Sequence, residues 1–140
     1  MKIRFVCCLV VGLFIVADAA AMDATPVEFE VHEVEVKLIE RTNAARIRNG
    51  LPALEMSAVL MKSARAHTAW MCNANTLVHT TQPVAENIAM GQHSVDQAIS
   101  DWLNSPGHRA NLLSANYSKI GVAAYRAKNG SIYWCQQFIW

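Results

Sequence analysis

Residues 94–112 read SVDQAISDWLNSPGHRANL, and this stretch joins the clearest helix of the chain to its most function-like segment. Ser94 and Gln97 stand three residues apart, the spacing of a capping box, which marks the start of a helix. Apolar residues then recur at the i, i+3, i+4, i+7 and i+8 positions of one helix face, namely Val95, Ala98, Ile99, Trp102 and Leu103. The pattern predicts an amphipathic helix that ends by Ser105.

A Pro-Gly pair follows this helix and precedes a histidine. Proline and glycine together disfavour continuation of the preceding helix, so His108 is expected on a surface corner with its imidazole facing a cleft. Two further polar residues in unusual sequence settings, His79 and Glu86, are candidates for the other walls of that cleft. The sequence therefore predicts a site formed by His79, Glu86 and His108.

The N-terminal half of the chain predicts two helices. Thr25-Pro26-Val27-Glu28 has the residues of a helix start, and apolar residues at spacings of three and four continue to about Asn49, where Gly50 and Pro52 end the helix. Ser57 is expected to cap a second helix that ends at Cys72.

The second predicted helix carries a histidine on its buried stripe. His67 follows Leu60 and Ala64 on this face, and a lone histidine in such a place is more often a hydrogen-bonded core residue than a ligand. The segment 73–92 that follows is polar and irregular, and a loop of this length favours a binding role. It contains two of the three candidate site residues.

The C-terminal part of the chain predicts a β-hairpin. Strand-like runs at 120–127 and 131–140 flank Asn129-Gly130, a pair typical of a two-residue turn in which both central residues have positive φ.

The N-terminus has the pattern of a secretory signal. Lys2 and Arg4 precede an apolar run, and Ala17-Asp18-Ala19 fits a cleavage site, so we predict a signal peptide at 1–19 and one domain at 25–140. The apolar run is roughly 13 residues long, shorter than the ~20 that span a bilayer, so a retained membrane anchor is the weaker alternative. The mature chain is expected to be secreted, periplasmic or extracellular, without a transmembrane segment.

Two cysteines, Cys72 and Cys135, remain after removal of the signal. In an exported chain such a pair favours one disulfide, and two buried free thiols are the alternative. The bond would close a loop of about 60 residues.

The net charge of the chain argues against nucleic acids and anionic membranes as partners. The chain has 12 Lys and Arg against 11 Asp and Glu, a formal net charge of +1. This balance shows neither the basic surface of a nucleic-acid-binding protein nor a polybasic membrane patch.

Several short motifs follow one another in a fixed order along the chain. They are Asn43-Ala44-Ala45-Arg46, Gly50-Leu51-Pro52, Ala64-Arg65-Ala66-His67, His79-Thr80, Ala85-Glu86-Asn87-Ile88-Ala89, Trp102-Leu103-Asn104-Ser105-Pro106-Gly107-His108-Arg109, Ile120-Gly121-Val122 and Tyr133-Trp134-Cys135-Gln136. In this order they closely resemble the bacterial SCP-like branch of the CAP superfamily, over about Val31 to Phe138. Its eukaryotic relatives are cysteine-rich secretory proteins, wasp-venom antigen-five proteins and plant pathogenesis-related proteins.

The resemblance implies an α+β fold, a three-layer α-β-α sandwich with a short antiparallel sheet and a surface cleft. Two histidines and two acidic residues line the cleft in the family. By motif, the histidines match His79 and His108 and the first glutamate matches Glu86. The second glutamate of animal members falls where this sequence has Ser105, so only a three-residue site can be carried over.

Two histidines and one carboxylate form a possible zinc site with one coordination position open. Metal-assisted hydrolysis is chemically admissible at such a site, although the helical His-Glu-x-x-His arrangement is absent from the sequence. Ser105 is a conceivable nucleophile, but a Ser-Pro turn residue explains it better. The trio also fits a purely structural role, in which Glu86 and the histidines fix the long loop.

Three functions follow as hypotheses. The first is a secreted, non-enzymatic binding module whose cleft holds a divalent metal ion and a small or lipidic ligand. The second is a metal-assisted hydrolase with the same cleft. The third is an interaction module that binds a protein partner through surface aromatic residues such as Tyr117, Tyr125 and Trp140.

Overall fold

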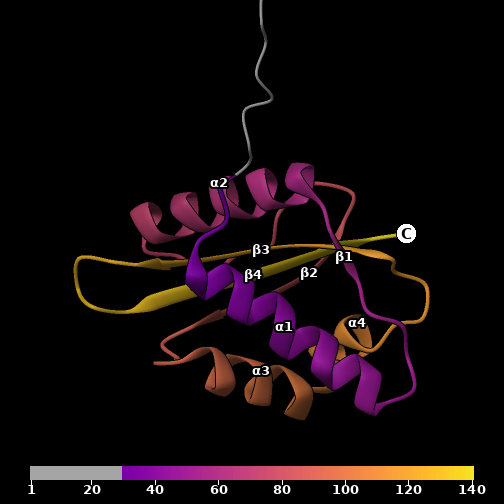
Figure 1. Cartoon of the computed structure of the whole chain (residues 1–140). Coiled ribbons are helices and arrows are strands. Elements are labelled where there is room, and N and C mark those ends of the chain that lie inside the picture. The colour runs from indigo at the N-terminus through magenta and orange to yellow at the C-terminus, as the bar shows by residue number, and fades with distance from the viewer. Residues whose placement is uncertain (1–29) are drawn as a thin grey trace, which may run out of the picture.

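The computed structural model describes residues 30–140, which form three layers (Figure 1). Helix α2 (Ala58–Ala74) covers one face of a four-stranded sheet. Helices α1 (Glu33–Arg48), α3 (Val95–Asn104) and α4 (Pro106–Leu112) lie on the other side. The α-β-α sandwich implied by the resemblance is confirmed.

The sheet has the strand order β1-β3-β4-β2. Strand β4 (Ile132–Ile139) lies between β3 (Lys119–Arg126) and β2 (Ala85–Met90) and pairs antiparallel with both. The short strand β1 (Glu55–Met56) adds a parallel pair at the start of β3. Every residue of β4 except the last is buried, as expected for a strand covered on both faces.

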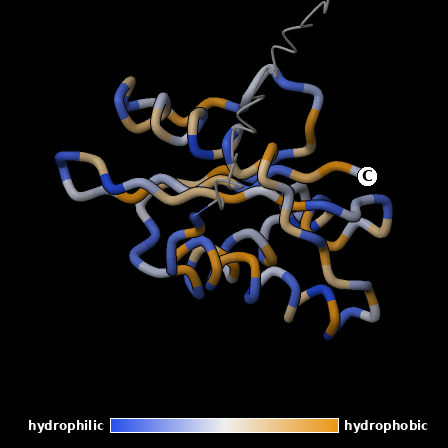
Figure 2. The backbone as a smooth tube through the Cα atoms, turned by 45° about the horizontal axis from the view of Figure 1, so that its top comes forward, coloured by the Kyte–Doolittle hydropathy of each residue, from blue (hydrophilic) through white to orange (hydrophobic). Residues whose placement is uncertain are grey.

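Each face of the sheet has its own core. The face toward α1 and α3 packs large side chains, among them Leu38, Trp102 and Phe138. The face toward α2 packs a second cluster, which combines small residues such as Ala64 and Ala123 with Tyr133. A Cβ atom added to Gly121 would lie 2.2 Å from the backbone of Leu60, so α2 crosses β3 too closely for any side chain there. Figure 2 shows apolar residues along the strands.

The first helix begins later than the sequence pattern predicts. Residues 30–32 are not helical, and α1 starts at Glu33 with His32 as its N-cap. The carboxylate of Glu35 accepts the backbone N–H of His32 at 2.9 Å, so the capping box forms here, seven residues after the predicted one. Residues 25–29 and the predicted signal peptide at 1–19 lie outside the described residues. None of the helices within 30–140 has the length and apolar character needed to cross a membrane.

The predicted hairpin is confirmed, but its turn is longer than two residues. Ala127 accepts the N–H of Gly130 at 2.9 Å and donates its own N–H to Ser131 at 2.8 Å. Gly130 has φ +89°, whereas Asn129 does not have positive φ. This is a type I turn followed by a left-handed glycine, which adds a bulge to the hairpin.

A buried arginine fixes the start of the segment that follows α4. The guanidinium of Arg46 donates to the backbone oxygens of Leu112 and Ser114 at 3.0 and 2.8 Å. It also donates to those of Pro52 and Tyr117 at 3.0 and 3.3 Å. Burial lowers the pKa of Arg46 from its ordinary value. One side chain of α1 thereby holds the end of α4 in place.

Candidate functional site

Glu86 is the centre of the candidate site and lies in a strand, not in a loop. The sequence interpretation of 73–92 as one irregular loop is wrong at both ends, because α2 continues to Ala74 and β2 occupies Ala85–Met90. Pairing with β4 places Glu86 opposite Gln137. This pairing is a long-range contact, which the polar local sequence does not reveal.

The carboxylate of Glu86 is buried and accepts hydrogen bonds from several directions. Oε1 accepts from His79 Nδ1 and from the backbone N–H of Thr80, both at 2.9 Å. Oε2 accepts from Gln137 Nε2 at 2.9 Å and from the thiol of Cys135 at 3.6 Å. Both oxygens are therefore committed to groups of the protein itself.

His79 connects this buried carboxylate to solvent. Its side chain is 60% exposed, while that of Glu86 is 3% exposed. Because the Glu86 carboxylate can only accept, the hydrogen-bond network assigns the proton of the neutral His79 ring to Nδ1. The Nε2 atom then carries a free lone pair. A carboxylate behind a histidine in this way fixes the orientation of the ring and raises its basicity as a ligand.

His67 belongs to the same cluster, which the sequence reasoning missed. Its Nε2 lies 2.9 Å from the backbone oxygen of Val78 and 3.7 Å from Glu86 Oε2. The ring also stacks on Trp70, with ring centroids 5.7 Å apart. The prediction of a hydrogen-bonded histidine is confirmed, and its partner is the residue before His79. A histidine on the buried face of a helix needs a polar partner. This requirement is the feature of the sequence that indicates a polar contact for His67.

His108 lies in α4, so the Pro-Gly pair begins a helix where the sequence pattern predicts a corner. Pro106 occupies the first helical position, where its missing N–H is not needed. His108 is half-buried. Burial lowers the pKa of His108, and the nearby charge of His79 lowers it further. The two imidazoles are therefore close enough to interact electrostatically.

Two asparagines hold α4 against β2. Asn87 Nδ2 donates to the backbone oxygen of His108 at 3.0 Å. Asn111 Nδ2 donates to the backbone oxygen of Glu86 at 3.2 Å and to Asn87 Oδ1 at 3.1 Å. The distance between the elements that carry His108 and Glu86 is thus fixed by hydrogen bonds.

The same network continues through the sheet to α1. Gln136 of β4 accepts from Asn87 Nδ2 at 3.2 Å and donates to Thr42 Oγ1 at 2.6 Å. Thr42 in turn donates to the backbone oxygen of Leu38 at 2.7 Å. All three side chains are fully buried. Buried polar groups satisfied in this way specify one arrangement of the elements around them.

Cys72 and Cys135 are free thiols in the structure, so the predicted disulfide is not present. The thiol of Cys135 donates to Glu86 Oε2 at 3.6 Å. Burial raises the pKa of Cys135 well above its ordinary value, and the Glu86 carboxylate raises it further. Of the two alternatives given by the sequence, the structure has the free thiols.

Ser105 joins α3 to α4. Its backbone N–H donates to Trp102 and its backbone oxygen accepts from Arg109, at 3.3 and 2.8 Å. Its side chain makes no capping hydrogen bond.

The three predicted residues do not form a ready three-ligand metal site. Within residues 30–140, no group of three His, Cys, Asp or Glu side chains is placed to hold a metal ion. The oxygens of Glu86 accept from four protein groups. What remains available for a ligand is the Nε2 of His79 beside the half-buried ring of His108.

The model of the cysteine-rich secretory protein family, CAP, matches residues 39–138. The chain belongs to the CAP family. The uncharacterised protein YkwD of Bacillus subtilis (strain 168) is 36% identical to this CAP domain over 126 residues, which cover 78% of the chain and 48% of YkwD. The chain therefore spans about half the length of that relative.

Solved structures agree with the assignment. An extracellular SCP-domain protein of Bacillus anthracis aligns with a TM-score of 0.66 at 29% identity, covering 75% of this chain and 39% of that one. An outer surface protein of Borrelia burgdorferi aligns with a TM-score of 0.68 at 21% identity, covering 74% of this chain and 89% of that one. The second likeness shows the CAP fold alone.

Proposed function

We propose that this CAP domain is a secreted, non-enzymatic binding module that holds a divalent metal ion, of which zinc is the best candidate, between His79 and His108. One observation carries the proposal: the hydrogen bond of 2.9 Å between His79 Nδ1 and the buried carboxylate of Glu86. It leaves Nε2 as a lone pair in solvent, which is the form of histidine that binds metals.

In this proposal Glu86 supports a ligand and is not one itself. The histidines supply two nitrogen donors, and water or groups of a bound partner complete the tetrahedral set that zinc prefers. Bound zinc would polarise an oxygen ligand placed beside it. The lowered pKa of His108 favours metal binding, because a smaller share of its imidazole is protonated at a given pH.

The same geometry argues against hydrolysis. A hydrolase needs a general base that can accept a proton from the attacking water. Glu86 is the nearest carboxylate, but its oxygens are directed at Thr80, Gln137 and other donors of the protein. Hydrolase activity is the alternative proposal, and turnover of a peptide or ester that is lost in His108→Ala would favour it.

Exposed apolar side chains next to His79 support a ligand with an apolar part. Trp70, Leu77 and Val78 are 51%, 44% and 50% exposed. They are connected to the site through His67, which stacks on Trp70 and hydrogen-bonds with Val78. A small or lipidic ligand could place a polar group at the metal and an apolar group on these side chains.

Calorimetric titration with Zn²⁺ tests the proposal. We expect saturable one-to-one binding at neutral pH that is lost in His79→Ala and in His108→Ala. His93→Ala is the matched control, because His93 is an exposed histidine before α3 and outside the site. Absence of binding in the unmodified protein, or equal binding in all variants, would contradict the proposal. The three residues would then have only a structural role in the loop.

Secretion is supported by the apolar N-terminal run and by relatives described as extracellular or outer-surface proteins. We expect the exported protein to begin after Ala19, which intact-mass measurement of the chain from the culture medium or the periplasm would show. A mass that includes residues 1–19 would favour the retained anchor.

A further inference from the structure

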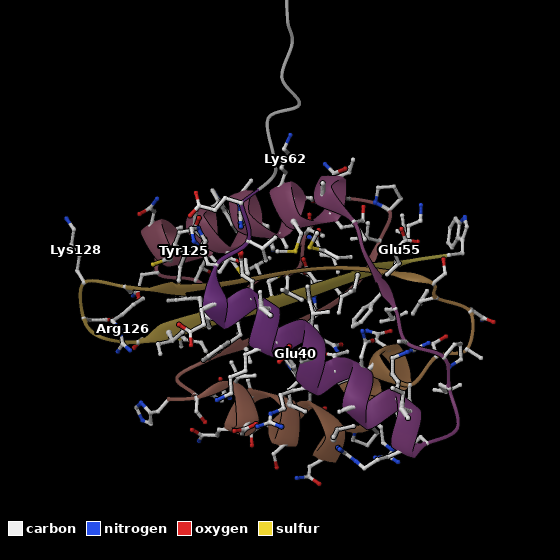
Figure 3. The ribbon with its side chains drawn as sticks, viewed as in Figure 1. Glu40, Glu55, Lys62, Tyr125, Arg126 and Lys128 are labelled. Atoms are coloured by element: carbon white, nitrogen blue, oxygen red, sulfur yellow. The ribbon has the colours of Figure 1, made fainter. Side chains whose placement is uncertain are left out.

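The solvent-facing side of α2 differs from that of the other two long helices. Of the seven exposed residues of α1, five are charged, and the five exposed residues of α3 are all polar or charged. Of the seven exposed residues of α2, five are apolar and only Lys62 is charged. Figure 3 shows the side chain of Lys62 pointing away from the sheet on this outer side. A surface helix normally carries polar side chains on its outer side, so the outer side of α2 is suited to an apolar environment.

The larger apolar side chains of this outer side lie in one row. Val59, Ala66 and Trp70 are seven and four residues apart, a spacing that places them on the same face of a helix. Val59 is 77% exposed and Trp70 is 51% exposed. The row therefore runs along most of the length of α2.

The loop after α2 extends the row. Leu77 and Val78 are 44% and 50% exposed. The ring of His67 stacks on Trp70, and its Nε2 lies 2.9 Å from the backbone oxygen of Val78, so the loop lies beside Trp70. We call these five apolar residues the α2 face: Val59, Ala66, Trp70, Leu77 and Val78.

The segment that carries the α2 face has no acidic residue. No aspartate or glutamate occurs from Met56 to Ala85, which includes all of α2 and its loop. The cations of this segment are Lys62 and Arg65, and Arg65 forms an ion pair with the buried Glu35. The segment thus has no carboxylate that lipid phosphates would repel and little positive charge that would attract an acidic protein. Apolar residues with a tryptophan, bordered by basic residues, are typical of a helix that lies at a membrane surface.

The described chain also begins on the α2 side. Arg65 Nη2 donates to the backbone oxygen of Glu30 at 2.9 Å, so the first described residue lies beside α2. The sequence before it contains the apolar run that we predict to be a signal peptide, with a retained anchor as the alternative. A segment of either kind enters the membrane during export. Its point of attachment to the domain is on the side of the α2 face.

We propose that the α2 face binds the surface of a lipid bilayer, with Trp70, Leu77 and Val78 among the headgroups and the upper acyl chains. Tryptophan is enriched at this depth because its ring is amphipathic. Burial of apolar side chains drives the binding, so no anionic lipid is needed, in agreement with the balanced net charge of the chain. A lipid of the bilayer then takes the place of a free lipidic ligand on these side chains. The proposal does not depend on a metal ion between His79 and His108.

Co-sedimentation of the mature protein with phosphatidylcholine vesicles tests the proposal. We expect saturable binding that changes little with salt concentration, because charge does not drive it. Trp70→Ser should weaken the binding about tenfold, and Val78→Ser should weaken it less. Trp140→Ser is the matched control, because Trp140 is 81% exposed but follows β4, outside the α2 face. Its binding should equal that of the unmodified protein.

Lipids with bromine on their acyl chains identify the residue in contact, since bromine quenches the fluorescence of a nearby tryptophan. Trp102 and Trp134 are buried between the sheet and the helices of the other side, so they should not be quenched. Trp70→Phe should keep vesicle binding and lose the quenching. Trp140→Phe should keep both.

Three results would overturn the proposal. The first is absence of vesicle binding in the unmodified protein, which would leave the α2 face to a protein partner. The second is equal weakening in Trp70→Ser and Trp140→Ser, which would indicate adsorption without a specific face. The third is binding that requires anionic lipids and that salt abolishes. Zinc titration of Trp70→Ser separates this proposal from the metal site, because zinc affinity should not change.

Discussion

Arg46 and Glu86 are both buried charged side chains whose hydrogen-bonding capacity is used by the protein, yet they serve different ends. Arg46 donates to four backbone oxygens, so every partner is part of the scaffold. Glu86 shares its oxygens between scaffold donors and His79, whose side chain is 60% exposed. The backbone partners of Arg46 make it a structural contact between elements, whereas the bond from Glu86 to His79 orients an imidazole at the surface.

In the proposed function, the site has no exposed carboxylate. The carboxyl group of Glu86 is in the interior, where donors from β4 and from the loop before β2 hydrogen-bond with it. Only the histidine carries its effect to the surface. A mutation at Arg46 should therefore change stability alone, and one at Glu86 should change both stability and binding.

The largest expected effect is that of Arg46→Leu. The substitution leaves several backbone oxygens without donors, and each buried polar group without a partner costs ~1–3 kcal/mol. We expect the free energy of unfolding to fall by about 3–5 kcal/mol, a large share of the stability of a small domain. Chemical denaturation measures it. Arg48→Leu, an exposed change on the same helix, should stay within about 0.5 kcal/mol. Equal effects of the two substitutions would show that Arg46 is not a structural contact between elements.

Glu86→Gln should have a smaller effect on stability and a specific effect on binding. The amide keeps the volume of the side chain but loses charge-assisted hydrogen bonds, at a cost of about 1–3 kcal/mol. Loss of the carboxylate behind His79 should weaken Zn²⁺ binding about 10–100-fold. Glu55→Gln, an exposed change in β1, is the control for both measurements. Unchanged zinc affinity in a folded Glu86→Gln protein would assign Glu86 to loop architecture alone.

The features predicted correctly from local sequence patterns depend on interactions between residues that are close in the sequence. The cap at Ser94, the helix that ends at Asn104 and the hairpin around Gly130 are all present. The same logic chose the wrong start for the first helix, because Thr25 and His32 are both followed at the capping-box spacing by a glutamate. The local sequence favours Thr25, a preferred N-cap residue, over His32. A contact distant in sequence, in which Arg65 of α2 donates to Glu35, supports the observed start.

The features that the sequence did not predict depend on partners far along the chain. The local sequence of strand β2 resembles a polar loop, because the partners that stabilise the strand are distant in the sequence. Glu86 bonds with Gln137 and Asn87 with Gln136, each about 50 residues away. His67 joined the site for the same reason, through Val78. The motif resemblance named His79, Glu86 and His108 as candidates, and the structure adds that Glu86 is buried and bonded to the exposed His79.

The smallest expected effect concerns the thiol of Cys135, which is buried beside Glu86. Burial and the Glu86 carboxylate raise the pKa of Cys135 above its ordinary value of about 9. In the unfolded chain the thiol ionises near that value, whereas in the folded protein it remains protonated. The folded state thus binds more protons above pH 9, and the stability of the protein falls as the pH rises above 9.

Denaturation under reducing conditions should show a smaller loss of stability between pH 8 and pH 10 in Cys135→Ala than in the unmodified protein. Cys72→Ala should leave this loss unchanged, because Cys72 is only half-buried and lies away from Glu86. Equal pH dependence in the two variants would mean that Cys135 ionises as readily in the folded protein as in the unfolded chain.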